Sequence, residues 1–159
     1  RGLGDVYKRQ VIESMGAEIT YKEHSVIVNK ADELKGLEVD CKMIPDAAMT
    51  LAVMALFCKG STKLTNIASW KVKETDRIIA MQNELVKLGA SVSSTNNSIT
   101  IDPPLEIKNN IQIDTYDDHR MAMCFSLASL KKNSIIINDP ECVKKTYPNY
   151  FYDFEKIML

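Results

Sequence analysis

The order of helices and strands that this chain of 159 residues predicts occurs twice, and this internal repeat restricts the possible folds more than any other feature. In each copy a helix is followed by Gly-Ala, at Gly16 and again at Gly89, and an aspartate stands at the start of an apolar helix, at Asp46 and again at Asp118. The copies are about 72 residues apart, a spacing typical of repeated structural units. Such a repeat predicts an α/β protein of stacked subdomains that share one core.

Periodicity and turn residues define the elements of each copy. Apolar residues three or four apart, among them Ile78, Met81 and Leu85, predict an amphipathic helix at the start of the second copy. In the first copy we expect a helix that ends at Gly16, a hairpin over 18–21 and 25–28, a strand over 37–40, an apolar helix over 47–59 that Gly60 stops, and a strand over 63–67. In the second we expect a helix over 76–88, a hairpin over 91–93 and 98–101, a strand over 111–114, a helix over 121–130 and a strand over 134–138.

Overall charge and cysteine spacing argue against several classes of function. The formal net charge is -1, so the chain as a whole does not attract nucleic acid or an anionic membrane. No apolar run reaches the roughly 18 residues that span a bilayer. The four cysteines form no C-x-x-C pair and have no histidine at ligand spacing, which predicts reduced thiols in a cytoplasmic protein and no metal site. Any anion site must therefore be a local cluster of basic residues.

Potential cations concentrate in three short segments, two of which open a helix. They are Lys71, Lys73, Arg77, His119, Arg120, Lys144 and Lys145. Backbone N–H groups at a helix N-terminus favour an anion, and the planar guanidinium matches carboxylate or phosphate oxygens. A small ligand with two or more anionic groups would account for this concentration. The alternative is that each segment is a solvated surface without a ligand, which fits less well because the segments lie at equivalent places in the two copies.

Asp46 and Glu74 are the candidates for proton transfer, because two carboxyl groups in different environments can give and take a proton in one reaction. The alternative role of Asp46 is to cap the helix that follows Pro45, a contribution of about 1 kcal/mol. The alternative role of Glu74 is that of an ordinary first-turn glutamate. His119, beside Arg120 at a helix start, is a candidate hydrogen-bond donor to a ligand.

Four motifs resemble those of one enzyme family. I-P-D-A-A-M-T (44–50), W-K-V-K-E-T-D-R (70–77), D-H-R-M-A-M-C-F-S-L (118–127) and K-T-Y-P-N-Y-F (145–151) are similar to the C-terminal signatures of the 5-enolpyruvylshikimate-3-phosphate synthases, in the order and with the spacing of that family. The resemblance implies two similar α/β domains that close over a cleft, each an inside-out α/β barrel of three repeated βαβαββ-type subdomains. This chain would supply about two of the three repeats of the C-terminal domain, and one wall of the cleft.

The resemblance also implies a reaction and roles for individual residues. An enolpyruvyl group passes from phosphoenolpyruvate to the 5-hydroxyl of shikimate 3-phosphate, phosphate is released, and no cofactor or metal is needed. Asp46 would accept the hydroxyl proton, and Glu74 would protonate the methylene of phosphoenolpyruvate. The family's contacts to phosphoenolpyruvate fall on Arg77, Arg120, Lys145 and His119, and its contacts to shikimate 3-phosphate fall on Asp46, Lys73 and Ser69. Two positions depart from the family, since Ser69 and Asp117 stand where asparagine is common.

The predicted domain division is uneven. Residues 1–10 lack the apolar helix expected there, and we treat them as an uncertain or non-native segment. Residues 11–159 form the partial C-terminal domain, with units at about 11–75 and 76–159. The expected partners are the two small substrates and the missing N-terminal domain, in a monomeric cytoplasmic enzyme, so the chain alone is expected to be inactive.

Two alternative functions stay open. A related transferase that acts on UDP-N-acetylglucosamine should lack the paired K-E-T-D-R and D-H-R-M-A-M motifs. A non-catalytic or nucleic-acid-binding module of the same fold should carry an extended basic face with stacking aromatic residues.

Overall fold

The computed structural model describes residues 3–131 and 133–158, and its elements follow the repeated order. The helices are α1 (Leu3–Ser14), α2 (Pro45–Met54), α3 (Arg77–Lys87), α4 (His119–Ser126) and α5 (Tyr150–Met158), with 3₁₀ segments at Ala55–Phe57, Ala68–Val72, Leu127–Lys131 and Pro140–Lys145. The strands are β1 (Glu18–Tyr21), β2 (Val26–Asn29), β3 (Leu34–Lys35), β4 (Glu38–Asp40), β5 (Cys58–Lys59), β6 (Thr62–Thr65), β7 (Ser91–Ser94), β8 (Ser98–Asp102), β9 (Ile111–Ile113) and β10 (Ile135–Ile137).

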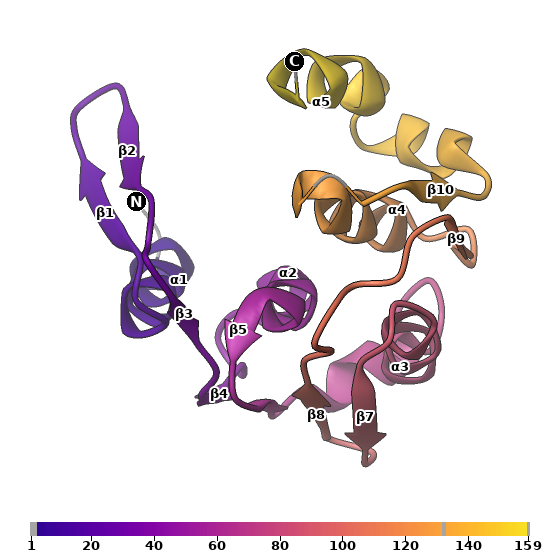
Figure 1. Cartoon of the computed structure of the whole chain (residues 1–159), viewed down its shortest axis with the longest axis horizontal. Coiled ribbons are helices and arrows are strands. Elements are labelled where there is room, and N and C mark those ends of the chain that lie inside the picture. Colours follow the sequence, from indigo (N-terminus) through magenta and orange to yellow (C-terminus); the bar gives the residue numbers. More distant parts are fainter. Residues whose placement is uncertain (1–2, 132, 159) are drawn as a thin grey trace.

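Strand pairing repeats with the sequence. Each copy has an antiparallel hairpin, β1–β2 and β7–β8, and a parallel pair, β4–β6 and β9–β10. The copies join where β6 pairs antiparallel with β8, which gives a sheet of order β4-β6-β8-β7. Figure 1 shows α1 and the β1–β2 hairpin on one side, α2 in the middle, and α3 and α4 on the other side. The predicted α/β fold class is confirmed.

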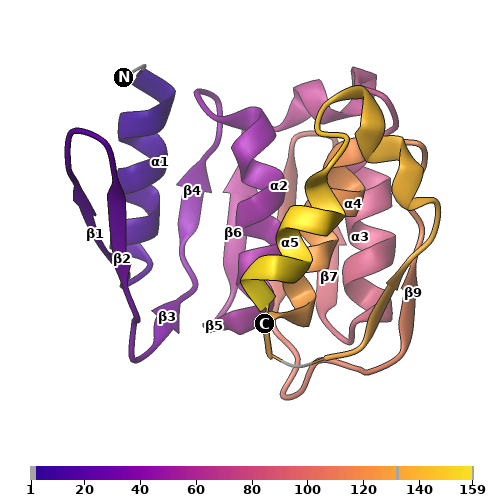
Figure 2. The ribbon, with the colours of Figure 1, turned by 90° about the horizontal axis from the view of Figure 1, so that it is seen from above.

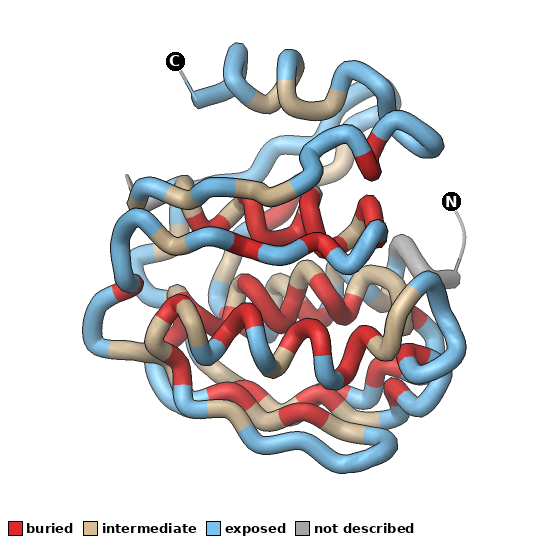
Figure 3. Tube along the Cα trace, turned by 90° about the vertical axis from the view of Figure 1, so that its right-hand side faces the viewer, coloured by how far each residue is buried: buried red, intermediate tan, exposed pale blue. Residues whose placement is uncertain are grey.

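The most apolar helices lie inside. Residues of α2 and α4 pack against each other and against strand residues such as Leu64 and Ile99, all within one core cluster. In Figure 3 buried residues follow the inner helices and the strands facing them, whereas α5 carries no buried residue. Trp70 is buried and its Nε1–H donates to the carbonyl of Pro45 at 2.7 Å, which fastens the start of α2 to the segment before α3. The core therefore fixes where the inner helices begin.

The predicted helix over 47–59 is wrong at its C-terminal end. The α-helical part ends at Met54, and Cys58–Lys59 forms β5, which pairs in parallel with β3. Gly60 does have a positive φ of 81°, but it follows a strand and does not cap a helix. Pairing with β3 satisfies the backbone of residues 58 and 59, and an apolar run alone does not reveal such a partner. The glycines at the ends of the other helices are confirmed, since Gly16 and Gly89 have φ of 107° and 105°.

The first and fourth helices begin earlier than the sequence indicates. The helix α1 begins at Leu3 and ends at Ser14, and the buried residues of this segment, Val11 and Met15, lie in its last turns and directly after it. The helix α4 begins at His119, because Asp118 caps it. The division into residues 1–10 and 11–159 stays a prediction. Within the described residues, none of the helices combines the length and apolar character needed to cross a bilayer.

Candidate active site

The first turns of three helices meet around one guanidinium. Figure 2 shows α2, α3 and α4 side by side. Asp46 lies in the first turn of α2, Arg77 begins α3, and Arg120 is the second residue of α4. Two caps direct these starts: Asp76 accepts from the N–H groups of Ile78 and Ile79 at 3.1 and 3.3 Å. Asp118 accepts from the Arg120 N–H at 2.9 Å. Residues more than 70 positions apart thus share one site.

Arg77 is the centre of the cluster. Its side chain is only 1% exposed, and it donates to three carboxylates. Its Nε and Nη2 donate to the two carboxylate oxygens of Asp118 at 2.7 and 3.2 Å. Nη2 also donates to Glu74 Oε2 at 2.7 Å, and Nη1 donates to Asp46 Oδ1 at 3.2 Å. Burial by itself would lower the pKa of Arg77, but the hydrogen bonds and charges of these carboxylates outweigh it, so its pKa is raised. Arg77 therefore stays charged and orients both proton-transfer candidates.

Asp118 is the residue that the sequence reasoning missed as part of the site. It is fully buried, it caps α4, and it holds Arg77 through both oxygens. Burial alone would raise the pKa of Asp118, but the hydrogen bonds from Arg77 and from the Arg120 N–H outweigh it and the pKa is lowered. The signal that could have found it was its repeat equivalence to Asp46, which points to a paired role for the two aspartates.

Asp46 faces cations instead of capping its helix. The cap position of α2 is Ile44, without a side-chain hydrogen bond, so the capping interpretation of Asp46 is wrong. Asp46 Oδ2 accepts from Arg120 Nη2 at 3.1 Å, and Lys73 Nζ lies 3.8 Å from Oδ1. Its side chain is 42% exposed, so a ligand can reach it. Three cations hold one accessible carboxylate.

His119 and Glu74 lie beside Arg77 on the side of α4. His119 Nδ1 is 3.7 Å from Glu74 Oε1 and 3.8 Å from Asp118 Oδ1, and it is buried with no hydrogen-bond partner among the residues that the structure describes. Glu74, Asp118 and His119 place one potential ligand atom each within 4.8 Å of the others. Arg77 already donates to both carboxylates, which offsets part of their negative charge. This arrangement suits proton transfer near a fixed positive charge better than metal coordination.

The remaining predicted residues are not among the hydrogen-bond or ion-pair partners described for Arg77. Lys145 is exposed, and its Nζ donates to the carbonyl of Asp117 at 3.2 Å, immediately before Asp118. Ser69 is exposed in the 3₁₀ segment before α3, and none of the hydrogen bonds described for the Arg77 cluster reaches it. Lys144 is ion-paired with Glu141 at a separate cavity.

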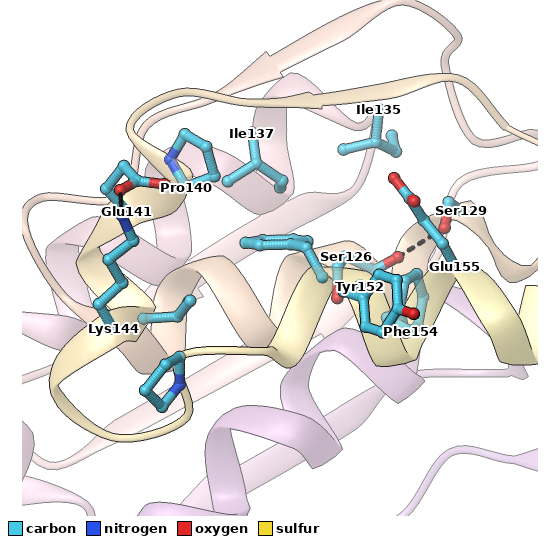
Figure 4. A pocket seen from close by; sticks show the side chains of 13 residues that line it. Ser126, Ser129, Ile135, Ile137, Pro140, Glu141, Lys144, Tyr152, Phe154 and Glu155 are labelled. Carbon is cyan, nitrogen blue, oxygen red and sulfur yellow. Dashed lines mark hydrogen bonds and ion pairs between the residues drawn. The ribbon is translucent and has the colours of Figure 1, made fainter.

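That cavity does not contain the cluster. It measures about 480 Å³ and lies between α4, β10 and α5, with Ile135, Ile137 and Phe154 among its lining residues (Figure 4). The structure thus brings Asp46, Glu74, Arg77 and Arg120 into contact, with His119 and Lys73 at their edge. The cleft that the family resemblance implies beside them stays a prediction.

Protonation of His119 should make folding sensitive to pH. Burial, together with the positive charges of Arg120 and Lys145, outweighs the nearby carboxylates and lowers the pKa of His119 below its usual value. The unfolded state then binds the proton more tightly, so this contribution to stability is complete above pH of about 6.5 and is lost as pH falls toward the folded-state pKa. We expect His119→Gln to flatten the fall in the free energy of unfolding between about pH 7 and pH 5.

The measurement is urea unfolding of the complete protein across this pH range. The exposed His24, in the turn between β1 and β2, offers the matched control, since His24→Gln should keep the wild-type slope. An unchanged slope in His119→Gln would contradict the assignment.

Comparison with known proteins agrees with this geometry. The sequence profile of the family EPSP synthase (3-phosphoshikimate 1-carboxyvinyltransferase) matches residues 3–154. The 3-phosphoshikimate 1-carboxyvinyltransferase of Photobacterium profundum is 52% identical over 148 residues, which are 93% of this chain and 34% of that protein. The enzyme of the same name from a Sulfurovum species is 51% identical over 154 residues, 97% of this chain and 36% of that protein.

Solved structures show the same fold. An EPSP synthase from Acinetobacter baumannii superposes with a TM-score of 0.82 at 27% identity, over 93% of this chain and 38% of that chain. The enolpyruvyl transferase NikO from Streptomyces tendae has a TM-score of 0.76 at 16% identity, which shows the fold alone. The chain spans about a third of the length of the curated relatives it matches. With its repeated α/β units and the Arg77 cluster, the chain belongs to the EPSP synthase family.

Proposed function

We propose that the complete protein transfers the enolpyruvyl group of phosphoenolpyruvate to the 5-hydroxyl of shikimate 3-phosphate and releases phosphate. The observation that carries this proposal is that Asp46 and Glu74 both lie on the buried Arg77, with Arg120 and Lys73 beside Asp46. The family match and the names of the relatives support the same reaction.

The geometry suits two opposite proton transfers. Forming a bond between the 5-hydroxyl oxygen and C2 of phosphoenolpyruvate requires a proton at the methylene carbon and loss of the hydroxyl proton. Glu74, on one nitrogen of Arg77, is the proton donor in this scheme, and the accessible Asp46, on another, is the acceptor. Loss of a methyl proton and of phosphate then restores the double bond and gives the enolpyruvyl ether.

Positive charge near the carboxylates suits the anionic groups of both substrates. In this scheme Arg77, Arg120, Lys145 and His119 serve phosphoenolpyruvate, and Lys73 and Ser69 serve shikimate 3-phosphate. Cations fixed in a site that excludes water stabilise a developing charge more than cations in solution do. Arg120 and Lys73 are 37% and 35% exposed, which leaves their heads accessible to phosphate or carboxylate oxygens.

The same proposal assigns the rest of the cleft to a part of the protein outside this chain. Val26, Val28 and Ile136 are exposed on β2 and β10, each of which has a single partner strand within the described residues. Exposed apolar strand edges of this kind call for further strands. We propose that the rest of the complete protein supplies these strands, and that its N-terminal domain supplies the second wall of the site, in a monomeric cytoplasmic enzyme. The presence of both the K-E-T-D-R and the D-H-R-M-A-M motif disfavours a UDP-N-acetylglucosamine transferase.

The isolated chain is expected to show no turnover, because it holds one wall of the site. Phosphate release from phosphoenolpyruvate is measured in the presence and absence of shikimate 3-phosphate, for the chain and for the complete protein. We expect release only from the complete protein and only with both substrates. Phosphate release that depends on UDP-N-acetylglucosamine would instead identify the protein as the related transferase. Sustained turnover by the chain alone would refute the proposal that the site needs two walls.

A further inference from the structure

The turn that leads into α4 has an unusual backbone. Tyr116 and Asp117, directly before the cap residue Asp118, have positive φ of 55° and 54°. Non-glycine residues rarely adopt this region, and a bulky aromatic residue does so only where its surroundings hold it there. The turn is also short: Asp118 N–H donates to Thr115 O at 2.9 Å.

A buried carboxylate of α3 holds this turn through two hydrogen bonds. Glu84, in the last turn of α3, has a fully buried side chain. Its Oε2 accepts from the backbone N–H of Asp114 at 3.1 Å, and its Oε1 accepts from the hydroxyl of Tyr116 at 2.8 Å. Lys87 Nζ, 2.7 Å from Glu84 Oε2 and 2.7 Å from Asp114 Oδ2, offsets part of the negative charge of these two carboxylates. Glu84 therefore bonds both ends of residues 114–116.

The first copy of the repeat lacks this turn, and its residue at the position equivalent to Glu84 is apolar. Val11 stands five residues before Gly16, as Glu84 stands five residues before Gly89, and Val11 is an ordinary core residue. The connection in the first copy is longer, since Asp40 and Asp46 are six residues apart.

In the second copy Asp114 and Asp118 are only four residues apart. None of residues 41–45 has a positive φ, and all five are described. The helix itself thus accepts an apolar residue at this position, so the carboxylate serves the turn.

We propose that Glu84 is a positioning residue for the site: it holds turn 114–117 in the conformation that places Asp118, His119 and Arg120. Asp118 sets both the start of α4 and the orientation of Arg77, so a shift of this turn reaches the ligand-binding groups directly. Lys145 bonds the carbonyl of Asp117, which puts a further predicted ligand contact on the same turn. Glu84 itself does not touch a ligand in this scheme.

The test compares variants of the complete protein that contains this chain. Glu84→Leu removes both acceptor oxygens, and Glu84→Gln keeps an acceptor. The control is Ile99→Ala, a fully buried residue of β8 that is not part of the turn or the site. The readouts are the thermal midpoint, hydrogen exchange of the backbone amides in residues 114–120, and KM and kcat for phosphoenolpyruvate.

We expect Glu84→Leu to speed exchange at residues 114–120 and to raise KM for phosphoenolpyruvate by about 10- to 100-fold, since displacement of binding groups by about 1 Å is costly. Glu84→Gln should restore much of both properties. Ile99→Ala should lower the midpoint and leave KM unchanged. If Glu84→Leu lowers the midpoint as Ile99→Ala does but leaves KM and local exchange unchanged, Glu84 is only a structural residue and the inference is wrong.

A second variant decides the matter if Glu84→Leu does not fold. Tyr116→Phe removes one of the hydrogen bonds, and it should also speed exchange at residues 114–120, whereas normal exchange would refute the inference. The kinetic readout rests on the proposed function, but the exchange readout does not. If the wild-type protein does not turn over shikimate 3-phosphate, the proposed function is wrong. Hydrogen exchange of the amides in residues 114–120, measured with and without inorganic phosphate, would still decide the role of Glu84.

Discussion

Replacing Arg77 with methionine is expected to lower the free energy of unfolding by about 3–5 kcal/mol, the effect of removing one partner of a buried ion pair. The buried Asp118 would keep its charge without a bidentate partner, and Glu74 and Asp46 would lose their shared donor. Urea unfolding of the complete protein measures this change.

Two further variants make the interpretation specific. Arg120→Met makes the same substitution in a half-exposed pair with Asp46, and it should cost no more than about 1 kcal/mol. Adding Asp118→Asn to Arg77→Met should recover part of the loss, because the unpaired buried charge is then removed. Equal losses for Arg77→Met and Arg120→Met would show that Arg77 does not hold the site together.

Replacing Glu74 with glutamine is expected to reduce kcat of the complete protein by about 10²- to 10⁴-fold, the usual contribution of a general acid or base. The amide oxygen can still accept from Arg77 Nη2, and Asp118 still holds Arg77 through two bonds, so the fold should survive. The measurement is the steady-state rate of phosphate release, with circular dichroism to confirm folding.

Asp76 provides the matched control for this variant. It lies two residues further along the same segment and caps α3 through the N–H groups of Ile78 and Ile79. Asparagine caps a helix about as well as aspartate does, so Asp76→Asn should retain most of the activity. A rate for Glu74→Gln close to that of Asp76→Asn would exclude Glu74 as the proton donor.

Individual elements show which parts of the fold could be predicted from the sequence. The helix ends at Gly16 and Gly89 were predictable, because only the local backbone conformation decides them. The end of α2 was not, since β5 exists only because the distant β3 lies beside residues 58 and 59. The sequence also located the cations of the site, but it did not separate Lys144 from Lys145. Lys144 lines a separate cavity, whereas Lys145 bonds the turn before α4.

The site shows the same division. The motifs named Asp46, Glu74, Arg77 and Arg120, which the structure places in contact. They did not reveal that Asp118 and Glu84 are fully buried carboxylates, one holding Arg77 and the other holding the turn before α4. Both look like ordinary charged residues of a helix start and a helix face, and only their partners distinguish them.

The sequence by itself determined the repeated α/β order, the family, and the residue types that meet at the helix starts, because periodicity, turn chemistry and motif spacing are local properties of a chain. The tertiary structure decided which carboxylate each cation contacts and which charges are buried. These depend on segments that are 31 to 74 residues apart in sequence and are brought together by packing of the inner helices. Burial sets the strength of each ion pair, and burial is a property of the packed molecule.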